Sequence, residues 1–292
     1  MKRRRADRMR VKGRSPKVCL ACLEYPPDRG GVARSAGRIA KYLVEEGFDV
    51  HVFTPKRGEP QGLPPEPFLQ DGAKVYRVAS GLSLSTEGIT GAIQAADDAV
   101  SFDIFHGVYL PMAYPCMLTD PDGLRPLIAS IQGSDAVEWG VNPVYREFMT
   151  AVLKRASWVT SVNTDYLRTA ADLADISGRS SFIPNGVDSA AFPRWRPTEA
   201  NRGVVGTVTV FRDVKNIPLL IQSYAGVDAR VRKRLLLVGD FPEGDENERF
   251  KVREAIRRHK VGREVRVTGY VGMPQISENL LAMRVFVLCS KH

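Results

Sequence analysis

The sequence lacks any long apolar run. No stretch of the 292 residues reaches the roughly 18 consecutive apolar side chains that a membrane-spanning helix needs. The N-terminus also lacks the apolar segment of a secretory signal peptide, and no short internal repeat indicates a solenoid. We therefore expect a globular cytoplasmic protein. Its 43% hydrophobic residues are enough to build a core, and its length fits one large or two ordinary domains.

Cysteine is also scarce, with four residues in the chain. Cys19 and Cys22 have the spacing of zinc knuckles and thioredoxin motifs, but both lie in an apolar segment that predicts a strand, residues 17–24. Side chains three positions apart on a strand point to opposite faces, which argues against both motifs. We interpret the cysteines as core thiols in a reducing cytoplasm.

Acidic residues are nearly absent from the first 17 positions, which hold nine Lys or Arg and only Asp7. This segment carries +8 of the net charge of +9, so the other 275 residues are nearly neutral as a whole. Residues 1–16 have no apolar periodicity and are predicted to be a disordered basic tail. Two interpretations remain open: a bland extension, or an arm (residues 1–17) that contacts an anionic membrane surface. Because the body is neutral, no nucleic-acid partner is expected.

The chain does have a regular alternation of short apolar strands and amphipathic helices, which predicts an α/β fold with parallel sheets. Residues 56–72 are rich in proline and glycine and are expected to form a loop. In the first half the expected strands are 17–24, 50–55, 74–78, 103–106, 127–131, 158–161 and 181–183, and the expected helices are 32–46, 89–100, 109–118, 144–155 and 164–174.

A second domain of the same doubly wound type is expected over residues 203–292, after a first domain at 17–195. The boundary is placed near 195–202, in a connection rich in proline and arginine. Doubly wound domains usually carry five or six strands, so the second domain is expected to be incomplete. Its expected strands are 204–210, 235–240, 265–269 and 285–290, and its expected helices are 216–227, 247–259 and 274–283.

The segment 203–217 carries the clearest chemical signal. Its predicted strand runs into a loop with Arg212 and Lys215, and a helix begins near Asn216. Open α/β sheets bind ligands at the carboxyl ends of their strands, and a helix N-terminus adds unpaired N–H groups. Two cations at this point suit a diphosphate; the alternative is a pair of ordinary surface cations.

Six segments, in order, resemble the retaining nucleotide-sugar glycosyltransferases of family 4. The resemblance covers residues 17–292 and implies the GT-B fold, in which two Rossmann-like domains face each other across a cleft. It implies no cofactor, and a nucleotide diphosphate sugar as co-substrate. The segments are PPDRGGVARSAGRIAKYLVEEGFDVHVFTP, FDIFHG, LIASIQGSD, IPNGVDSAAF, VGTVTVFRDVKN, and the run LLLVGD, VRVTGYV, VFVLCSKH.

The resemblance implies that Gly30 and Gly31 lie near the sugar and phosphate, and that Arg212 and Lys215 hold the diphosphate. The glycine pair alone is equally consistent with a plain tight turn. The Arg–Lys gap is three residues here and five in the family's common form, so the assignment rests first on Lys215. The resemblance also implies metal-independent chemistry.

His106 and Gln132 are the catalytic candidates. His106 is expected to close a strand, where it would transfer a proton or bind acceptor hydroxyls; the alternative is a hydrogen-bonded structural histidine. Gln132 stands where the family usually has His before Gly-Ser-Asp. Glutamine forms hydrogen bonds but does not titrate, so either hydrogen bonding suffices or activity is impaired. Asp135 is expected to orient this loop or to cap the following turn.

Asn185 and Val271 are weaker candidates for binding the nucleotide sugar. Asn185 would reach the ligand or cap a turn, and Gly186 is expected to supply a backbone conformation that other residues resist. Val271 follows a strand end at which the family's backbone contacts the base.

The predicted function is transfer of a sugar from a nucleotide diphosphate sugar to a hydroxyl acceptor, a glycan or a lipid-linked molecule, with retention and without metal. In the family, two glutamates follow the segment that resembles LCSKH, so the 292-residue form looks like a truncated fragment with negligible turnover. The alternatives are a non-catalytic homologue and a GT-B nucleotide-sugar epimerase. A lipid-linked acceptor would fit a protein held at the inner membrane surface by its basic tail.

Overall fold

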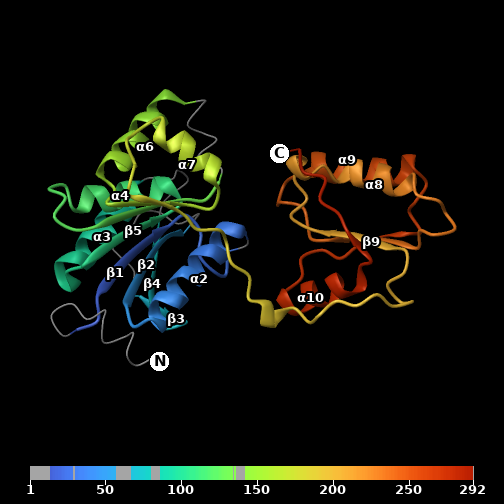
Figure 1. The fold of residues 1–292 in the computed structure, drawn as a ribbon, viewed down its shortest axis with the longest axis horizontal. Helices are drawn as coiled ribbons and strands as arrows, with labels where there is room; N and C mark the ends of the chain where they lie inside the picture. Colours follow the sequence, from blue (N-terminus) through green and yellow to red (C-terminus); the bar gives the residue numbers. More distant parts are fainter. Residues whose placement is uncertain are drawn as a thin grey trace. The chain divides into compact units, whose positions relative to one another are not determined.

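The computed structural model describes residues 14–28, 30–56, 67–79, 86–133, 135 and 142–291. The chain divides into two compact units, Met1–Asn185 and Gly186–His292 (Figure 1). The predicted basic tail, apart from residues 14–16, lies outside the described residues. No helix in the described part of the chain combines the length and the apolar character needed to cross a bilayer.

The first unit is built on one twisted sheet of eight strands in the order β3-β4-β2-β1-β5-β6-β7-β8. All its pairings are parallel except that of β3 with β4. This is the expected doubly wound α/β organisation. The strands are β1 (Lys17–Cys22), β2 (Asp49–Lys56), β3 (Phe68–Gln70), β4 (Ala73–Ala79), β5 (Ile104–Val108), β6 (Leu127–Ile131), β7 (Trp158–Ser161) and β8 (Ser180–Phe182).

Helices cover the two faces of this sheet unequally. One core cluster joins Leu20 and Cys22 of β1 to α2, and the other joins Cys19 and Ala21 to α3, α4, α6 and α7. Cys19 and Cys22 therefore point to opposite faces, fully buried and without a disulfide, as the sequence predicted. Burial raises the pKa of Cys22 to about 12. The helices are α2 (Gly31–Glu45), α3 (Thr86–Val100), the 3₁₀ turn η2 (Leu110–Met112), α4 (Ala113–Thr119), α6 (Pro143–Arg155) and α7 (Thr164–Ala171).

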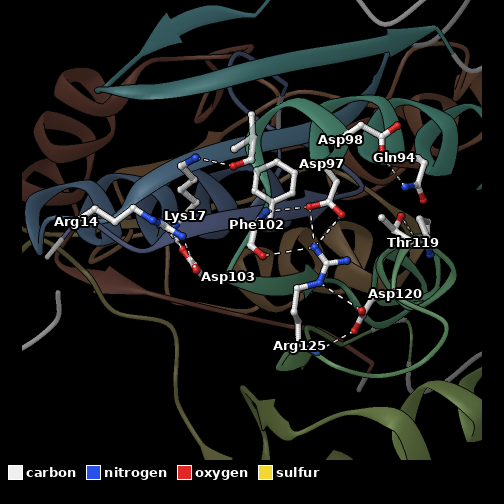
Figure 2. A network of polar contacts seen from close by, with 12 residues as sticks. Arg14, Lys17, Gln94, Asp97, Asp98, Phe102, Asp103, Thr119, Asp120 and Arg125 are labelled. Carbon is white, nitrogen blue, oxygen red and sulfur yellow. Dashed lines mark hydrogen bonds and ion pairs between the residues drawn. The ribbon is translucent and has the colours of Figure 1, made fainter. Parts of the chain in front are cut away.

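A network of charges closes the amino edge of the first sheet (Figure 2). The Arg125 guanidinium lies 2.7 Å from Asp97 Oδ1 and 3.2 Å from Asp120 Oδ1, and stacks over the ring of Phe105. Arg155 donates to Asp120 as well. Asp97 and Asp120 are 8% and 5% exposed, so this network is nearly buried. Buried carboxylates need such partners because their desolvation is costly.

The second unit has a parallel sheet of four strands in the order β11-β10-β9-β12. Alternate residues of β10 separate its two faces: Leu235 and Leu237 pack with α8 and α9, and Leu236 and Val238 pack with Met283, which follows α10. The strands are β9 (Val204–Val208), β10 (Arg234–Val238), β11 (Val265–Val267) and β12 (Val285–Phe286), and the helices are η3 (Ser189–Ala191), η4 (Asp213–Lys215), α8 (Ile217–Ala225), α9 (Glu246–Arg258) and α10 (Met273–Ala282).

The structure differs from the sequence-based expectations in a few places. The expected loop 56–72 contains β3, which forms an antiparallel edge pair with β4. The helix expected at 109–118 begins as a 3₁₀ turn, because Tyr109 has a φ of 79° and Pro111 lacks a donor. The strand expected at 285–290 is paired only over Val285–Phe286.

The boundary between the two units falls after Asn185, earlier in the sequence than the expected position at 195–202. Residues 186–195 belong to the second unit by their contacts. Trp195 fixes this segment there, since its Nε1 donates to the carbonyl of Met283 at 2.8 Å.

Candidate functional site

The glycine loop forms the start of α2 at the carboxyl end of β1. Gly30 precedes the helix with a φ of 156°, and no side chain caps the first turn. The first N–H groups of α2 therefore lack a capping side chain, as an anion site requires. A Cβ on Gly30 would lie 2.9 Å from Glu24 Oε2, whereas a Cβ on Gly31 would meet nothing. Glycine at position 30 is favoured by its positive φ, since the Glu24 side chain can move aside, and Gly31 leaves open space at the helix start.

His106 lies within β5 and does not close it. The strand continues through Gly107 and Val108, which pair with Ala21 and Cys22 of β1. The ring Nε2 of His106 is 2.8 Å from Ser130 Oγ, which in turn is 2.6 Å from Thr160 Oγ1. Burial lowers the pKa of His106 to about 4. The side chain is therefore a neutral hydrogen-bonding group at neutral pH, at the end of a row of hydroxyls across three strands.

Gln132 directly follows β6, at the carboxyl edge of the sheet. The buried carboxylate of Asp135 accepts hydrogen bonds from the backbone N–H groups of Gln132 at 3.1 Å and Gly133 at 2.6 Å. It also accepts from Leu110 N at 2.9 Å, which ties this loop to the end of β5. Burial raises the pKa of Asp135, against the opposing effect of these backbone donors. Asp135 thus orients the loop, and the half-buried Gln132 amide has no polar side-chain partner in the described residues.

Asn185, the last residue of the first unit, is tied to the glycine-loop helix. Its Oδ1 accepts a hydrogen bond of 2.9 Å from Ser35 Oγ, a buried hydroxyl in the second turn of α2. The Asn185 side chain therefore binds α2 instead of capping a turn. Gly186 has no positive φ, so the prediction of an unusual backbone conformation there is wrong. A Cβ at this glycine would meet no neighbour within 4 Å.

In the second unit, buried aromatic rings fix the loop after β9. Phe211 is fully buried and packs edge-on against Phe241, with ring centroids 5.1 Å apart. The backbone continues to pair with the segment after β10, through Phe211 N to Asp240 O at 2.9 Å. A Cβ on Gly239 would lie 1.8 Å from Thr209 O, so only glycine permits this approach. The loop that carries Arg212 and Lys215 is thereby anchored on one side.

Arg212 and Lys215 make no ion pair with any described residue, and Arg212 is exposed while Lys215 is half-buried. Between them lies Asp213, whose carboxylate is bound by Lys251 of α9 at 2.9 Å and by Lys291 near the chain end. These two lysines lower the pKa of Asp213 to about 2. Two lysines therefore neutralise the loop carboxylate, and Arg212 and Lys215, which flank it in the sequence, have no ion-pair partner in the described residues.

Val271 follows β11 at the same edge of the second sheet. Because β9, β10 and β11 are parallel, their carboxyl ends meet there, and the loops with Lys215 and Val271 flank β10. The side chain of Val271 packs against the core cluster of Val204, Leu236, Val238 and Met283. The side chain is thus partly buried, and the contact of its backbone with a ligand stays a prediction.

The sequence-predicted residues thus form two sets, one at the carboxyl edge of each sheet. Gly30, Gly31 and Gln132 belong to the first set, with His106 deeper in the same sheet. The sequence analysis did not identify several residues that bind Asn185, His106 or Asp213: Ser35, Ser130, Lys251 and Lys291. Each lies 24 to 150 residues from its partner, so no local spacing could have indicated it. The described residues hold no group of three or more His, Cys, Asp or Glu placed to share a metal ion.

Two family models match consecutive parts of the chain. Glycosyltransferase Family 4 matches residues 29–191, and Glycosyl transferases group 1 matches residues 192–292. No curated protein matches the sequence.

Solved structures match over nearly the whole chain at low identity. Sucrose-phosphate synthase from Thermosynechococcus elongatus has a TM-score of 0.78 at 17% identity, over 95% of this chain and 76% of that one. HepE of Anabaena, in complex with UDP and glucose, has a TM-score of 0.73 at 16% identity, over 95% and 75%. The catalytic domain of starch synthase IV from Arabidopsis thaliana, bound to ADP and acarbose, has a TM-score of 0.68 at 14% identity, over 95% and 78%. These likenesses confirm the predicted fold class, two Rossmann-like domains of the GT-B type.

Proposed function

Because the chain belongs to glycosyltransferase family 4, we propose that it transfers a sugar from a nucleotide diphosphate sugar to a hydroxyl acceptor, with retention of configuration and without a metal ion. The observation that carries this proposal is the cation pair after β9. Arg212 and Lys215 lie at the carboxyl edge of a parallel sheet, without counterions among the described residues, next to an acid already neutralised by two lysines. This arrangement suits a dianionic leaving group.

In the proposed reaction, the bond between the anomeric carbon and the diphosphate oxygen breaks, and the charge left on the nucleotide is stabilised by Lys215 and Arg212. The acceptor hydroxyl attacks the same face through an oxocarbenium-like state, and its proton passes to the departing phosphate oxygen. No protein nucleophile is required. The backbone beside Val271 would contact the base of the nucleotide.

His106 and Gln132 are proposed to bind hydroxyl groups and not to transfer protons. The pKa of His106, lowered to about 4 by burial, leaves it uncharged at neutral pH, and Ser130 occupies its Nε2. Gln132 offers both a donor and an acceptor at the end of β6. An amide and neutral hydroxyls can order a sugar without altering its charge. The uncapped start of α2 at Gly31 would face a phosphate oxygen or a polar sugar group.

The ligands of similar structures support a nucleoside diphosphate sugar as the donor, and they differ in the base. HepE is described in complex with UDP-glucose, and starch synthase IV is bound to ADP. The acceptor is proposed to be a hydroxyl group of a glycan or of a lipid-linked molecule. The contact with a membrane through residues 1–17 stays a prediction, since all but the last four of these residues lie outside the described chain.

Binding and turnover can be measured separately. Calorimetry with UDP, GDP and ADP in the presence of EDTA should show binding of at least one, and Lys215→Ala should weaken it at least tenfold. Arg253→Ala, an exposed cation of α9 without an ion pair in the described residues, is the matched control and should bind as the unaltered chain does.

Sugar release from the matching donor is then followed in EDTA. Wild-type affinity in Lys215→Ala would sink the assignment of this loop, and a strict need for a divalent cation would sink metal independence. Tight binding without any sugar transfer or hydrolysis would favour the non-catalytic alternative.

A further inference from the structure

The near neutrality of the folded body conceals a strong separation of charge between the two units. Residues 18–185 hold 14 Lys or Arg against 20 Asp or Glu, a net charge of −6. Residues 186–292 hold 19 against 12, a net charge of +7. The diphosphate loop, with Arg212, Asp213 and Lys215, accounts for only one of these seven charges. The rest of the excess therefore needs another explanation.

Much of the excess gathers at the amino edge of the second sheet. The turn before β10 and the turn between α9 and β11 both lie there, because β10 and β11 are parallel neighbours. Six cations of these two turns and of the adjoining strands and helix end are exposed, and their side chains make no ion pair or hydrogen bond within the described chain. We call this set the basic edge: Lys233, Arg234, Arg258, Lys260, Arg263 and Arg266.

The acidic side chains of this region are already engaged by other arginines. Asp228 pairs with Arg230, and Glu254 pairs with Arg257. Glu264 pairs with Arg232 at 3.0 Å and accepts a hydrogen bond of 2.8 Å from Tyr224 Oη. The ion pair of Arg232 with Glu264 also joins the turn before β10 to the turn before β11, which holds the two turns of the basic edge together.

Ordinary structural reasons cover only part of this pattern. Arg258 lies in the last turn of α9, where the helix dipole favours a cation. No such reason applies to Lys233 and Arg263, which lie in the turns before strands, or to Arg234, the first residue of β10. Apart from the attraction between Arg258 and Glu254, these exposed cations mainly repel one another, and an anionic surface would relieve that repulsion.

One exposed aliphatic side chain, Val231 at 56%, stands among these cations, and neither of the two turns has an exposed Phe, Tyr or Trp. Basic and aliphatic side chains together suit the headgroup region of a bilayer, whereas single-stranded nucleic acid calls for aromatic stacking partners.

We propose that the basic edge binds the surface of an anionic phospholipid bilayer. Within this unit the amino edge is opposite the carboxyl edge that carries Arg212 and Lys215. A bilayer bound there leaves the diphosphate loop facing the aqueous side, where a soluble nucleotide sugar is found. The proposal concerns residues 231–267 and does not depend on the basic tail or on the donor.

The test uses the full chain and vesicles of phosphatidylcholine with or without about one third phosphatidylglycerol. The edge variant Lys233→Gln/Arg234→Gln/Arg263→Gln is compared in a sedimentation assay with Arg146→Gln/Arg168→Gln/Arg202→Gln, which removes three exposed cations elsewhere. Both variants keep the basic tail and the same net charge, so any difference reports on location. Their melting temperatures should equal that of the unaltered chain.

The edge variant should bind anionic vesicles at least tenfold more weakly than the control variant, neutral vesicles should bind neither, and added salt should erase the difference. Equal binding by the two variants would overturn the proposal. So would a loss of affinity confined to duplex DNA, which would identify the basic edge as a nucleic-acid surface. The single variant Arg263→Glu should weaken vesicle binding in the same direction, and an unchanged affinity would count against the proposal.

Discussion

The two units use their arginines and lysines in different ways. In the first unit Arg125 and Arg155 form ion pairs with nearly buried carboxylates, and Arg77 donates to the carbonyls of Tyr25 and Pro26. In the second unit Arg212 and Lys215 at one edge, and the six members of the basic edge at the other, have no counterion in the described chain. The first arrangement stabilises a fold, whereas the second leaves charge available to something outside it.

Pairing and burial therefore distinguish the cations that stabilise the fold from those available to bind a ligand, wherever they lie in the sequence. A cation that is paired and partly buried is expensive to remove, because its partner is left as an uncompensated buried charge. A cation without a partner contributes little to folding, since an exposed charge remains hydrated in both states. Removing a paired, partly buried cation should therefore lower stability, whereas removing an unpaired, exposed one should affect ligand binding.

The largest effect is expected for Arg125→Leu. The change removes the Arg125 guanidinium that pairs with Asp97 and Asp120, which are 8% and 5% exposed. It also removes the contact with the ring of Phe105. The free energy of unfolding of the first unit should fall by about 3–5 kcal/mol. Chemical denaturation followed by the near-ultraviolet signal would measure it. Arg168→Ala removes an exposed pair with Asp165 and should cost less than about 0.5 kcal/mol; similar losses for both variants would contradict the contrast.

A pH-dependent effect of intermediate size is expected from His106. Its folded pKa of about 4 lies below the ordinary value of 6.5, so between these values the unfolded chain binds a proton that the folded chain does not. Stability should therefore decline as the pH falls from about 6.5 to 4, by up to about 3 kcal/mol from this group.

The variant His106→Asn should lose that part of the pH dependence. The comparison is made by measuring denaturation midpoints at pH 7 and pH 5. Burial also lowers the pKa of His51, so some acid sensitivity should persist in the variant. An unchanged pH profile would show that His106 is accessible to water and protonates normally.

The smallest effect on stability is expected for Lys215→Ala, the change that should weaken nucleotide binding at least tenfold. Lys215 has no ion-pair partner in the described chain and lies just before α8, where the helix dipole disfavours a positive charge. The free energy of unfolding should change by less than about 0.5 kcal/mol, measured in the same denaturation assay without nucleotide. A loss of more than about 2 kcal/mol would mean that Lys215 is structural and that the two units do not differ in this way.

Local patterns in the sequence predicted the bounds of a strand or helix correctly where its buried residues recur at a regular period. The strands at 127–131 and 158–161 have the bounds that the apolar runs predicted, and α9 begins and ends within one residue of its prediction. The short strand β3 was missed because it is partly exposed and stands in a segment rich in proline and glycine. Its formation depends on pairing with β4, which no local pattern reports.

The candidate site shows the same division. The residue types and their order predicted a diphosphate loop at Arg212 and Lys215, and the fold places both at the carboxyl edge of a parallel sheet. The sequence pattern predicted that the strand ends at His106. The strand in fact continues for two residues, since Gly107 admits the close approach of Ala113, whose backbone N would lie 2.3 Å from a Cβ there.

The sequence by itself determined the family, the alternation of strands and helices, and the loops that carry candidate chemistry, because these depend on residue type and short spacing. Only the tertiary structure decided which charges are neutralised. Asp213 meets Lys291 across 78 residues, Arg125 meets Asp97 across 28, and the turns that form the basic edge come together only when β10 and β11 pair. Net charge can be counted along a chain, but the free energy of a charge depends on its neighbours and its burial, and folding sets both.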